Sequence, residues 1–576
     1  MSLGPDVYLG LDLGTSGLKG IALTASGEVI ARGSAAYPTH RPEPGACEQA
    51  PQDWIAAVEA VADQIAKLVA PRRWRGIGLS AMIPTLVTAG ADSEPVGMAI
   101  TWQDSRAEAL GDELREQCGA DDLYQVTGQW VDGRYLLPMF LRMAGEEPAR
   151  AAATAWLLGA KDYLFGWLTG EIATDPSTAA GFGCYQLEAG DWDQDVLAAA
   201  RSMAERPRSA ARPTSAPPAQ PPGLPALPPA LPALPPVLPS ATCRRLRAAA
   251  AARLGCGQIP VCLGAADSVL GALGLGVRNP GQVAYIAGTS TVIMGVADRP
   301  LLDPRHRFLV TPLSEPGRWG LEMDLLATGS AISWLAGLLA DIPDEAGLLA
   351  LAAATDPRDA PLILPYLSPG EQGALWDPLL RGSFIGLELR HGPRHLARGL
   401  VNGIVLETRR CLAVLDELAT PDGLTAPEEL TGPEELSATP GETATPGETA
   451  TPGQTAAPDE TARFSRELKV AGSSAADPAF RADLADATRR RVTMPGDHDT
   501  DFSARGAALL AARAIDGESP GSSSPGSSSP GCSSSGIAPL VAGPDQDRAV
   551  MWDCLWASYE QARDAIARHY HARRRT

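Results

Sequence analysis

The chain has 576 residues, a formal net charge of −20 and 45% hydrophobic residues. This length is too great for one hydrophobic core, so two large domains are expected. The negative charge argues against a nucleic-acid partner, because phosphate backbones are bound by Lys and Arg. It does not exclude a nucleotide, whose phosphates need only local amide groups and a metal ion.

Nine cysteines are scattered along the chain without a C-x-x-C pair, which is typical of reduced thiols in a cytoplasmic protein. No apolar run approaches the roughly 18 residues of a membrane span, and the N-terminus lacks the pattern of a signal peptide. We therefore expect a cytoplasmic protein without a membrane partner.

The N-terminal segment predicts three strands and a helix. The runs VYLGLDLG from residue 7, GLKGIALTA from residue 17 and EVIARGSAAY from residue 28 have the apolar or alternating character of strands. An amphipathic helix is expected over 51–70, with Pro51 near its start. Outside three interruptions, the rest of the chain has the same pattern of predicted strands and helices, which indicates an α/β fold.

The turn between the first two predicted strands has an unusual composition, because Asp12 is followed by Gly14, Thr15, Ser16 and Gly17. A turn of Gly and hydroxyl residues leaves several backbone N–H groups pointing outward, and such a nest binds phosphate. A carboxylate beside phosphate is repelled unless a cation lies between them. Asp12 therefore indicates a Mg²⁺ site.

One such turn is weak evidence, since β-hairpins that contain Gly and Ser are common. Lys19 follows this turn and has two readings: it neutralises a phosphate, or it lies in solvent on its strand.

Three segments interrupt the α/β pattern, at about 206–239, about 420–463 and about 517–536. The first is rich in Pro, which lacks the N–H donor needed in a helix or a central strand. The second is an acidic repeat, and the third is rich in Gly, Ser and Pro. We expect all three to be disordered insertions, because they cannot bury enough apolar surface to offset the entropy of ordering.

A second turn of the same design occurs in the C-terminal half. The run GQVAYIAGTSTVIMGVAD from residue 281 repeats the order strand, Gly-Thr-Ser turn, strand, with Gly288, Thr289 and Ser290 in the turn. Two matching turns are more specific than one, and they predict a nucleotide held between two similar domains. No P-loop pattern occurs in the sequence.

Asp267 is the best candidate for a group that accepts a proton. An apolar strand is expected to end at Gly264, and Asp267 begins a helix of small residues. An acid at this position is either a simple helix cap or a catalytic group. Because it stands shortly before the second turn, we expect it to face the cleft and to orient an attacking hydroxyl.

The sequence resembles the FGGY family of carbohydrate kinases, which includes xylulose, glycerol, ribulose and gluconate kinases. The resemblance is carried by DLGTSGLKG, EQAPQDW, ITWQDSRA, KDYLFGWLTGEIATDPSTAAGF, GAADSVLGALGLG, IAGTSTVIMG, LPYLSPGEQGALWDPLLRGSFIGL and GAALLAA. It implies an α/β fold of two actin-like (ribonuclease-H-like) ATPase domains flanking a cleft. The sugar-binding domain would span 5–276 and the nucleotide-binding domain 277–576.

The resemblance also implies roles for single residues, with Asp267 as the catalytic base, Asp12 as the metal-linked aspartate, and ATP and Mg²⁺ as cofactors. Ser473 stands where the family carries the second glycine of its adenosine loop, which puts nucleotide affinity there in question. The residues expected to contact ATP are Gly14, Thr15, Ser16, Lys19, Gly288, Thr289, Ser290, Gly329, Gly472 and Ser473.

The sugar is expected to meet Met82, Ile83, Trp102, Asp104 and Arg106, besides Asp267. Where xylulose kinases usually read Gly-Gln-Met-His-Gly, this chain keeps Met82 but has Ile83 in place of the histidine that reaches the sugar. Trp102 opens a W-x-D-x-R element that helps line the sugar site in relatives. Its alternative role is core packing.

The leading hypothesis is an ATP-dependent kinase that phosphorylates a primary hydroxyl of a sugar, D-xylulose first. Glycerol, ribulose, gluconate and other polyols are alternatives. An actin-like ATPase of the chaperone or filament type and a catalytically lapsed sugar-binding regulator are rivals from other classes. Asp267 and the W-x-D-x-R element favour the kinase. A small-molecule sugar is the expected partner, and a homodimer is one assembly left open.

Overall fold

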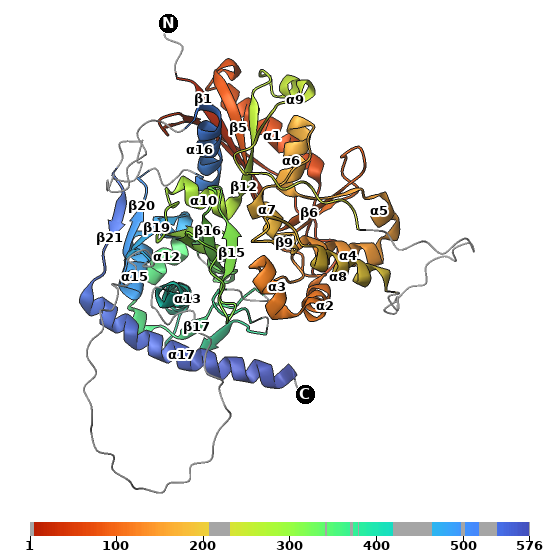
Figure 1. Ribbon diagram of the computed structural model, residues 1–576. Coiled ribbons are helices and arrows are strands. Elements are labelled where there is room, and N and C mark those ends of the chain that lie inside the picture. The colour runs from red at the N-terminus through yellow and green to blue at the C-terminus, as the bar shows by residue number, and fades with distance from the viewer. Residues whose placement is uncertain are drawn as a thin grey trace, which may run out of the picture.

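The computed structural model describes residues 5–206, 231–339, 342–368, 373–377, 379–418, 464–496, 501–517 and 538–574. The chain forms two lobes, each built around one central sheet (Figure 1). A cavity that both lobes line holds the candidate site.

The N-terminal lobe contains a six-stranded sheet with the order β11-β12-β5-β1-β2-β3. All seven residues of β1 are buried, as expected for a central strand covered on both faces. The bounds are β1 (Val7–Leu13), β2 (Gly17–Thr24), β3 (Val29–Ala36), β5 (Trp74–Ala81), β11 (Cys243–Arg245) and β12 (Pro260–Ala266).

The C-terminal lobe contains a seven-stranded sheet with the order β15-β16-β14-β13-β19-β20-β21. Its strands are β13 (Val283–Ala287), β14 (Thr291–Ala297), β15 (Leu309–Pro312), β16 (Trp319–Leu325), β19 (Glu467–Ala471), β20 (Arg491–Met494) and β21 (Leu540–Ala542).

The two sheets repeat one plan. In the first, β1 pairs antiparallel with β2 and parallel with β5; in the second, β13 pairs antiparallel with β14 and parallel with β19. An antiparallel strand then closes the far edge of each sheet, β11 beside β12 and β21 beside β20. The repeat predicted from the two Gly-Thr-Ser turns is therefore a repeat of the whole sheet topology.

Smaller sheets and helices complete the lobes. The minor strands are β4 (Glu48–Gln49), β6 (Thr85–Ala89), β7 (Ala99–Thr101), β8 (Trp156–Gly159), β9 (Tyr185–Gln186), β10 (Asp191–Trp192), β17 (Leu362–Leu364) and β18 (Ser383–Ile385). The helices of the N-terminal lobe are α1 (Pro51–Ala66), α2 (Glu108–Cys118), α3 (Ala120–Thr127), α4 (Leu136–Glu146), α5 (Pro148–Ala153), α6 (Ala160–Thr169), α7 (Pro176–Ala180), α8 (Gln194–Glu205), α9 (Ala248–Arg253) and α10 (Asp267–Gly274). Later helices are α11 (Gly329–Leu338), α12 (Glu345–Ala353), α13 (Pro393–Leu418), α14 (Ser473–Ala476), α15 (Pro478–Thr488), α16 (Phe502–Asp516) and α17 (Gln546–Arg574).

Helix α16 comes from the C-terminal half of the chain but packs against the sheet of the N-terminal lobe (Figure 1). A Cβ at Gly10 of β1 or at Gly78 of β5 would clash with the backbone of α16, so these glycines permit the close approach. Helix α16 also packs tightly against α10, where Gly274 and Gly506 lie against the partner backbone. The two helices thus lie at the junction of the lobes, and the division at 276/277 stays a prediction.

One expectation about the interruptions is wrong in part. Residues 231–239, placed in the disordered insertion at 206–239, are ordered against the N-terminal lobe. The carbonyl groups of Ala233 and Pro236 accept hydrogen bonds from Leu157 and Thr174, at 3.0 Å each. Pro lacks a donor but keeps its carbonyl acceptor, and leucines of this segment pack on an apolar cluster. The insertions at 420–463 and 517–536 lie outside the described residues, apart from Gly517.

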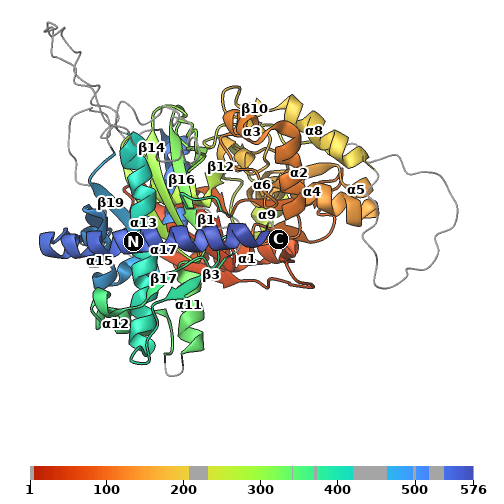
Figure 2. The same ribbon diagram turned by 90° about the horizontal axis from the view of Figure 1, so that it is seen from below.

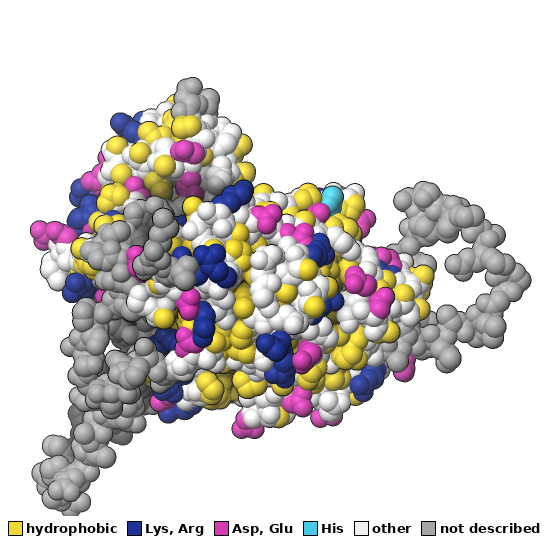
Figure 3. All heavy atoms as spheres, turned by 90° about the horizontal axis from the view of Figure 1, so that it is seen from above, with side chains coloured by type: hydrophobic (Ala, Val, Ile, Leu, Met, Phe, Trp, Pro, Cys, Tyr) yellow, Lys and Arg dark blue, Asp and Glu magenta, His cyan; other side chains and the backbone are white. Residues whose placement is uncertain are grey.

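Helix α17 crosses the lower side of the molecule and packs on the C-terminal lobe through buried Trp552 and Tyr559 (Figure 2). Acidic and basic side chains are interspersed on the face seen from above (Figure 3). Within the described ranges, no helix combines the length and the apolar character needed to cross a membrane.

Candidate active site

A cavity of about 230 Å³ lies between the lobes. It brings the two predicted turns together with the acid at the start of α10. The lining includes Thr15, Ile83, Trp102, Gln129, Arg134 and Tyr135 from the N-terminal lobe, Asp267 and Ser268 from α10, and Gly288, Thr289, Ser290, Thr311, Glu322 and Asp324 from the C-terminal lobe.

The first turn is held in shape by side chains from several other segments. The N–H of Gly14 donates to the carbonyl of Gly17 at 3.1 Å, and the hydroxyl of Tyr37 donates to the carbonyl of Gly14. Gln49 Nε2 donates to the carbonyl of Thr15 at 2.7 Å, and Trp102 Nε1 donates to Thr15 Oγ1 at 3.1 Å. A turn held at so many points is preorganised for a ligand.

Asp12 lies at the end of β1 and is almost fully buried. Its Oδ1 accepts a 2.6 Å hydrogen bond from Ser80 Oγ. Burial and the charge of Asp501 raise the pKa of Asp12 to about 7, against the lowering effect of Ser80. This carboxylate lies in an environment that disfavours a second negative charge and favours a nearby cation.

Lys19 does not line the cavity. Its Nζ pairs with Asp501 Oδ2 at 3.0 Å, and its side chain is 60% exposed. Ser16 is exposed on the turn and is not part of the lining. Of the residues predicted in the first turn, Thr15 is therefore the one that contributes directly to the cavity wall.

The second turn packs against the start of α11. The N–H of Gly288 donates to the carbonyl of Ser290 at 2.7 Å. The N–H and the hydroxyl of Ser330 both donate to the carbonyl of Thr289, at 3.0 Å each. A Cβ at Gly329 would clash with the carbonyl of Gly288, so glycine is required where helix and turn meet.

Gly472 follows β19 at the neighbouring strand end, with φ of +106°. A Cβ there would clash with the carbonyl of Ala287, just before the second turn, so both position and conformation require glycine. Ser473 Oγ lies 3.2 and 3.1 Å from the two carboxylate oxygens of Glu345 on α12. The second turn, the start of α11 and the 472–473 loop thus lie on one edge of the second sheet.

Asp267 is the first residue of α10, and its side chain lines the cavity. Its Oδ1 accepts from the N–H of Ser268 at 2.9 Å. Burial, then the charge of Asp12, raise the pKa of Asp267 well above its ordinary value. The strand before it, β12, ends at Ala266, two residues beyond the predicted end at Gly264.

A buried charged network supports the backbone before Asp267. Lys161 Nζ lies 3.2 Å from Asp162 Oδ1 and 3.1 Å from Asp175 Oδ1, and none of these side chains is exposed. Ser177 Oγ donates to Asp175 Oδ2 at 2.6 Å and accepts from the N–H that precedes Asp267 at 2.9 Å. Buried charges that are paired and hydrogen-bonded fix a single local geometry.

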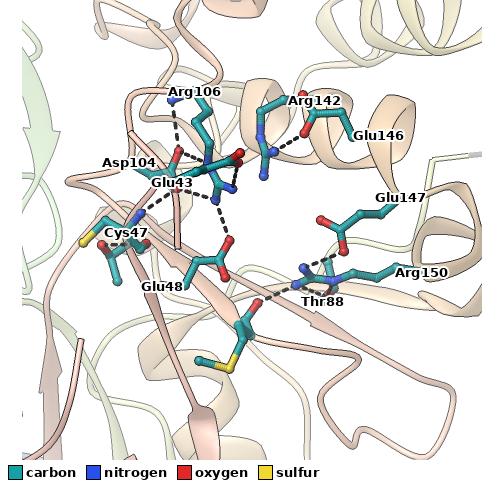
Figure 4. Close-up of polar contacts among 12 residues, drawn as sticks. Glu43, Cys47, Glu48, Thr88, Asp104, Arg106, Arg142, Glu146, Glu147 and Arg150 are labelled. Carbon is teal, nitrogen blue, oxygen red and sulfur yellow. Dashed lines mark hydrogen bonds and ion pairs between the residues drawn. The ribbon is translucent and has the colours of Figure 1, made fainter. Parts of the chain in front are cut away.

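The sugar-binding residues predicted from the sequence fall into three sets: two line the cavity, one lies in the core, and a charged pair lies away from the cavity. Ile83 and Trp102 line the cavity, and Met82 is buried in the core of the N-terminal lobe. Asp104 and Arg106 do not line it. Arg106 points at the carboxylates of Asp104, Glu43 and Glu48 (Figure 4).

Asp104 also accepts from the N–H of Cys47 at 2.9 Å. The Asp104–Arg106 pair therefore connects the loop that carries Trp102 to the β4 segment. In this position the pair supports Trp102 and does not contact the cavity. The sequence motif alone could not distinguish this role from direct sugar contact.

Further polar residues of the cavity were missed from the sequence. Glu322 and Asp324 alternate along β16, so both side chains point to one face of the sheet. Glu322 accepts from Thr311 Oγ1 at 2.7 Å. Burial, then the charge of Glu322, raise the pKa of Asp324 well above its ordinary value. The available signal in the sequence was the E-x-D spacing between apolar residues in the run WGLEMDL from residue 319, which has the alternation of a strand.

Gln129 and Arg134 come from the loop between α3 and α4. Gln129 Nε2 donates to the carbonyl of Val310 at 2.9 Å, so this loop contacts strand β15 of the other lobe. Arg134 forms a bidentate ion pair with Asp132, and its charge also acts on Asp324. The sequence offered only a polar and aromatic run here, without a recognisable motif.

The donor set suits Mg²⁺ held jointly by protein and substrate. Among the described residues, no three His, Cys, Asp or Glu side chains gather closely enough to enclose a metal ion. Mg²⁺ commonly binds through one or two carboxylates, water and substrate phosphates. The carboxyl group of Asp12, whose charge acts on that of Asp267, fits that mode.

Comparisons with known proteins agree with this geometry. Residues 7–206 match the N-terminal domain, and residues 283–515 the C-terminal domain, of the FGGY family of carbohydrate kinases. The chain is 30% identical over 401 residues to a xylulose kinase from Klebsiella pneumoniae, covering 69% of this chain and 76% of that protein. It is 26% identical over 420 residues to a gluconokinase from Bacillus subtilis, covering 71% and 77%.

Among solved structures, a xylulose kinase from Rhodospirillum rubrum superposes with a TM-score of 0.75 at 25% identity, covering 98% of this chain and all of that one. A gluconate kinase from Lactobacillus acidophilus superposes with the same TM-score at 20% identity, covering 98% and 99%. The predicted α/β fold of two actin-like domains is confirmed.

Proposed function

Since the chain belongs to the FGGY family of carbohydrate kinases, we propose that it transfers the γ-phosphoryl group of ATP to a primary hydroxyl of D-xylulose. The observation that carries the proposal is the shared cavity, in which both glycine-rich turns and Asp267 face one space. Phosphoryl transfer needs this combination of phosphate donors, a positioned acid and exclusion of water.

Each turn has its own part in the proposed reaction. The N–H groups of Gly14 and Gly288 close their own turns, so the backbone N–H groups of 15–16 and of 289–290 bind the phosphates from opposite sides. The hydroxyl groups of Thr15 and Thr289 add donors. Gly329 and Gly472 let the start of α11 and the 472–473 loop lie close to the second turn, where the nucleoside would bind. Ser473 and Glu345 offer hydroxyl and carboxylate partners there.

Asp267 orients the sugar hydroxyl and accepts its proton. Its raised pKa makes it a stronger base than an ordinary aspartate. Because the transition state for phosphoryl transfer is loose, orientation by the carboxylate contributes more than early proton removal. Asp12 would hold Mg²⁺ through water, and the ion would neutralise charge on the phosphates.

The walls of the cavity favour a neutral sugar over a sugar acid. Asp267, Glu322 and Asp324 face the same space as one guanidinium, that of Arg134, which is already bound by Asp132. Burial raises the pKa values of all three carboxyl groups, and neighbouring carboxylates raise those of Asp267 and Asp324 further. These shifts support a site that is unfavourable to further negative charge. A ketose such as D-xylulose fits this electrostatic environment better than gluconate does.

A cytoplasmic location is part of the same proposal. The eight cysteines in the described part of the chain are all free thiols, which suits a reducing compartment. The homodimer stays a prediction.

A coupled assay of ADP release tests the proposal. Purified protein with Mg²⁺ and ATP is compared across D-xylulose, D-ribulose, glycerol and D-gluconate. We expect D-xylulose to give the highest kcat/KM and gluconate the lowest. ADP release that no sugar stimulates would contradict the kinase and favour an actin-like ATPase, and strong preference for gluconate would contradict the assigned sugar class.

A further inference from the structure

Two cysteines lie directly opposite one another at the edge of the first sheet. Cys243 on β11 pairs with Cys262 on β12 in the antiparallel register. The neighbouring N–H of Leu263 donates to the carbonyl of Thr242 at 2.8 Å, so the cysteines occupy a non-hydrogen-bonded position. Facing residues at such positions have Cα atoms about 4.5 Å apart and side chains on the same face.

This placement meets the geometric requirement for a disulfide. Bridged cysteines have Cα atoms about 4.4 to 6.8 Å apart, so no large backbone movement is needed. Both side chains pack against the same apolar cluster, and each thiol donates to a nearby backbone carbonyl, Cys243 to that of Ala241 at 3.5 Å and Cys262 to that of Ser240 at 3.3 Å. Cys243 is only partly buried, whereas Cys262 is fully buried, so an oxidant in solution can reach one member of the pair.

The environment also makes Cys243 the more reactive member. The neighbouring Cys262 thiol and the charge of Arg244 lower the pKa of Cys243 below the ordinary value of a thiol, although burial opposes them. For comparison, burial raises the pKa of Cys256, in the loop just before β12, to about 11. Cys243 is therefore more readily a thiolate than this neighbour.

Strand β12 connects the pair to the candidate active site, because Asp267 follows it directly. Cys262 Sγ lies 3.3 Å from the carbonyl oxygen of Ser240. Ser240 Oγ donates to Asp175 Oδ2 at 3.1 Å, and Asp175 also accepts from Ser177, which holds the backbone N–H just before Asp267. A change in the position of Cys262 would therefore move Ser240, which is hydrogen-bonded to Asp175 in the network that supports the backbone before Asp267.

We propose that Cys243 and Cys262 form a redox site that hydrogen peroxide oxidises to a disulfide, and that the disulfide lowers turnover by altering the support of Asp267. The Cys243 thiolate attacks the peroxide, gives a sulfenic acid and releases hydroxide (water after protonation). The Cys262 thiol then attacks that sulfur, an S–S bond forms and water leaves. Two thiols are oxidised, and one peroxide is reduced. A dithiol reductant reverses the step by thiol–disulfide exchange.

Peptide mapping of the full-length protein tests the disulfide itself. The protein is treated with hydrogen peroxide, free thiols are alkylated, and the monomer band of a non-reducing gel is digested without reduction. The monomer is chosen because exposed Cys554 can link two chains. We expect one cross-linked peptide pair containing residues 243 and 262. Its absence, or Cys243 oxidised without a partner, would overturn the proposal.

Matched variants separate this site from the other cysteines. Cys243→Ser should lose both the cross-link and the response of turnover to peroxide, whereas Cys256→Ser should keep both. In the wild type, we expect turnover to fall at least threefold on oxidation and to return with dithiothreitol. An equal loss in Cys243→Ser, or a cross-linked protein of unchanged turnover, would overturn the link to Asp267. The turnover measurement rests on the proposed kinase function, whereas the cross-link does not, so the two can fail separately.

Discussion

The two Gly-Thr-Ser turns have the same scaffold but different chemistry. Both join an antiparallel strand pair, and both lie beside a parallel strand of the same sheet. The first carries the buried acid Asp12 two residues before its glycine, whereas the second carries Ile286 at that position. The repeated sheet plan therefore has a Gly-Thr-Ser turn in both lobes and the preceding acid in one.

The supports of the two turns differ as well. The first is bound by the side chains of Tyr37, Gln49 and Trp102 from its own lobe. The second is bound by the start of α11 and has Gly472 beside it. The first turn is thus held by side chains of its own lobe, beside Trp102 of the cavity wall, and the second is held by backbone contacts at one edge of the second sheet.

We expect the largest loss of turnover from a substitution of Asp267, the first residue of α10. The comparison residue is Asp501, which caps α16, the helix packed against α10. Asp267→Ala should lower kcat by about 10²- to 10⁴-fold, because the hydroxyl loses its base. ATP binding measured by calorimetry should be nearly unchanged. Asp501→Asn keeps the cap and should retain turnover within about tenfold. Equal turnover in Asp267→Ala and wild type would remove Asp267 from the mechanism.

Asp12→Asn should abolish turnover while stabilising the ligand-free protein above neutral pH. The folded-state pKa of Asp12 is raised to about 7, so the folded protein holds this proton more tightly than the unfolded chain does. The resulting stability is present below about pH 4 and is lost as pH rises to about 7.

Removing the carboxyl group should therefore raise the free energy of unfolding at pH 8 by up to about 4 kcal/mol, with little gain near pH 4. Urea titrations at both pH values measure the difference. Asp63→Asn, on the exposed face of α1, is the control and should change neither value. A gain for Asp12→Asn that is equal at both pH values would contradict the account.

Ile286→Asp gives the second turn the acid that it lacks. Ile286 lines the cavity, so a carboxylate there would repel the phosphates. We expect KM for ATP to rise at least tenfold. Ile286→Asn has a side chain of similar size without the charge, and its smaller effect would show that charge is the cause. Equal effects in both variants would show that packing decides.

We expect the smallest difference, in the free energy of unfolding, between substitutions of two glycines of α11. Gly329→Ala places a methyl group against the carbonyl of Gly288 and should lower the free energy of unfolding by about 1 to 3 kcal/mol, with a raised KM for ATP. Gly337 is exposed, and a Cβ added to it would meet no neighbouring atom. Gly337→Ala should therefore raise the free energy of unfolding by up to about 1 kcal/mol, because alanine favours the helix. If the two substitutions have the same sign in denaturant melts, the contact with the second turn is unimportant.

Much of the fold could be predicted because it is encoded locally. The strands at residues 7, 17 and 28 and the helix beginning at Pro51 follow from the spacing of apolar residues. The two turns follow from their Gly and hydroxyl composition. The helix predicted over 51–70 ends four residues earlier, at Ala66, and a turn leads to Pro71, because proline disfavours helical backbone in the residue before it.

Features that depend on distant contacts could not be predicted. The order of residues 231–239 depends on N–H donors and apolar surface supplied by the N-terminal lobe. Arg106 was assigned to the sugar, because nothing local shows that Glu43 and Glu48 lie within its reach. Glu322 and Asp324 reach the cavity only because β16 stands beside β14 in the second sheet.

Hydrogen exchange of the two turns on nucleotide binding tests the central claim most directly. The protein is labelled with and without a non-hydrolysable ATP analogue and Mg²⁺, and peptides spanning 14–17 and 288–291 are followed. We predict slower exchange in both peptides, since one triphosphate accepts hydrogen bonds from both lobes. Protection of one turn alone, with the other unchanged, would contradict a nucleotide held between them.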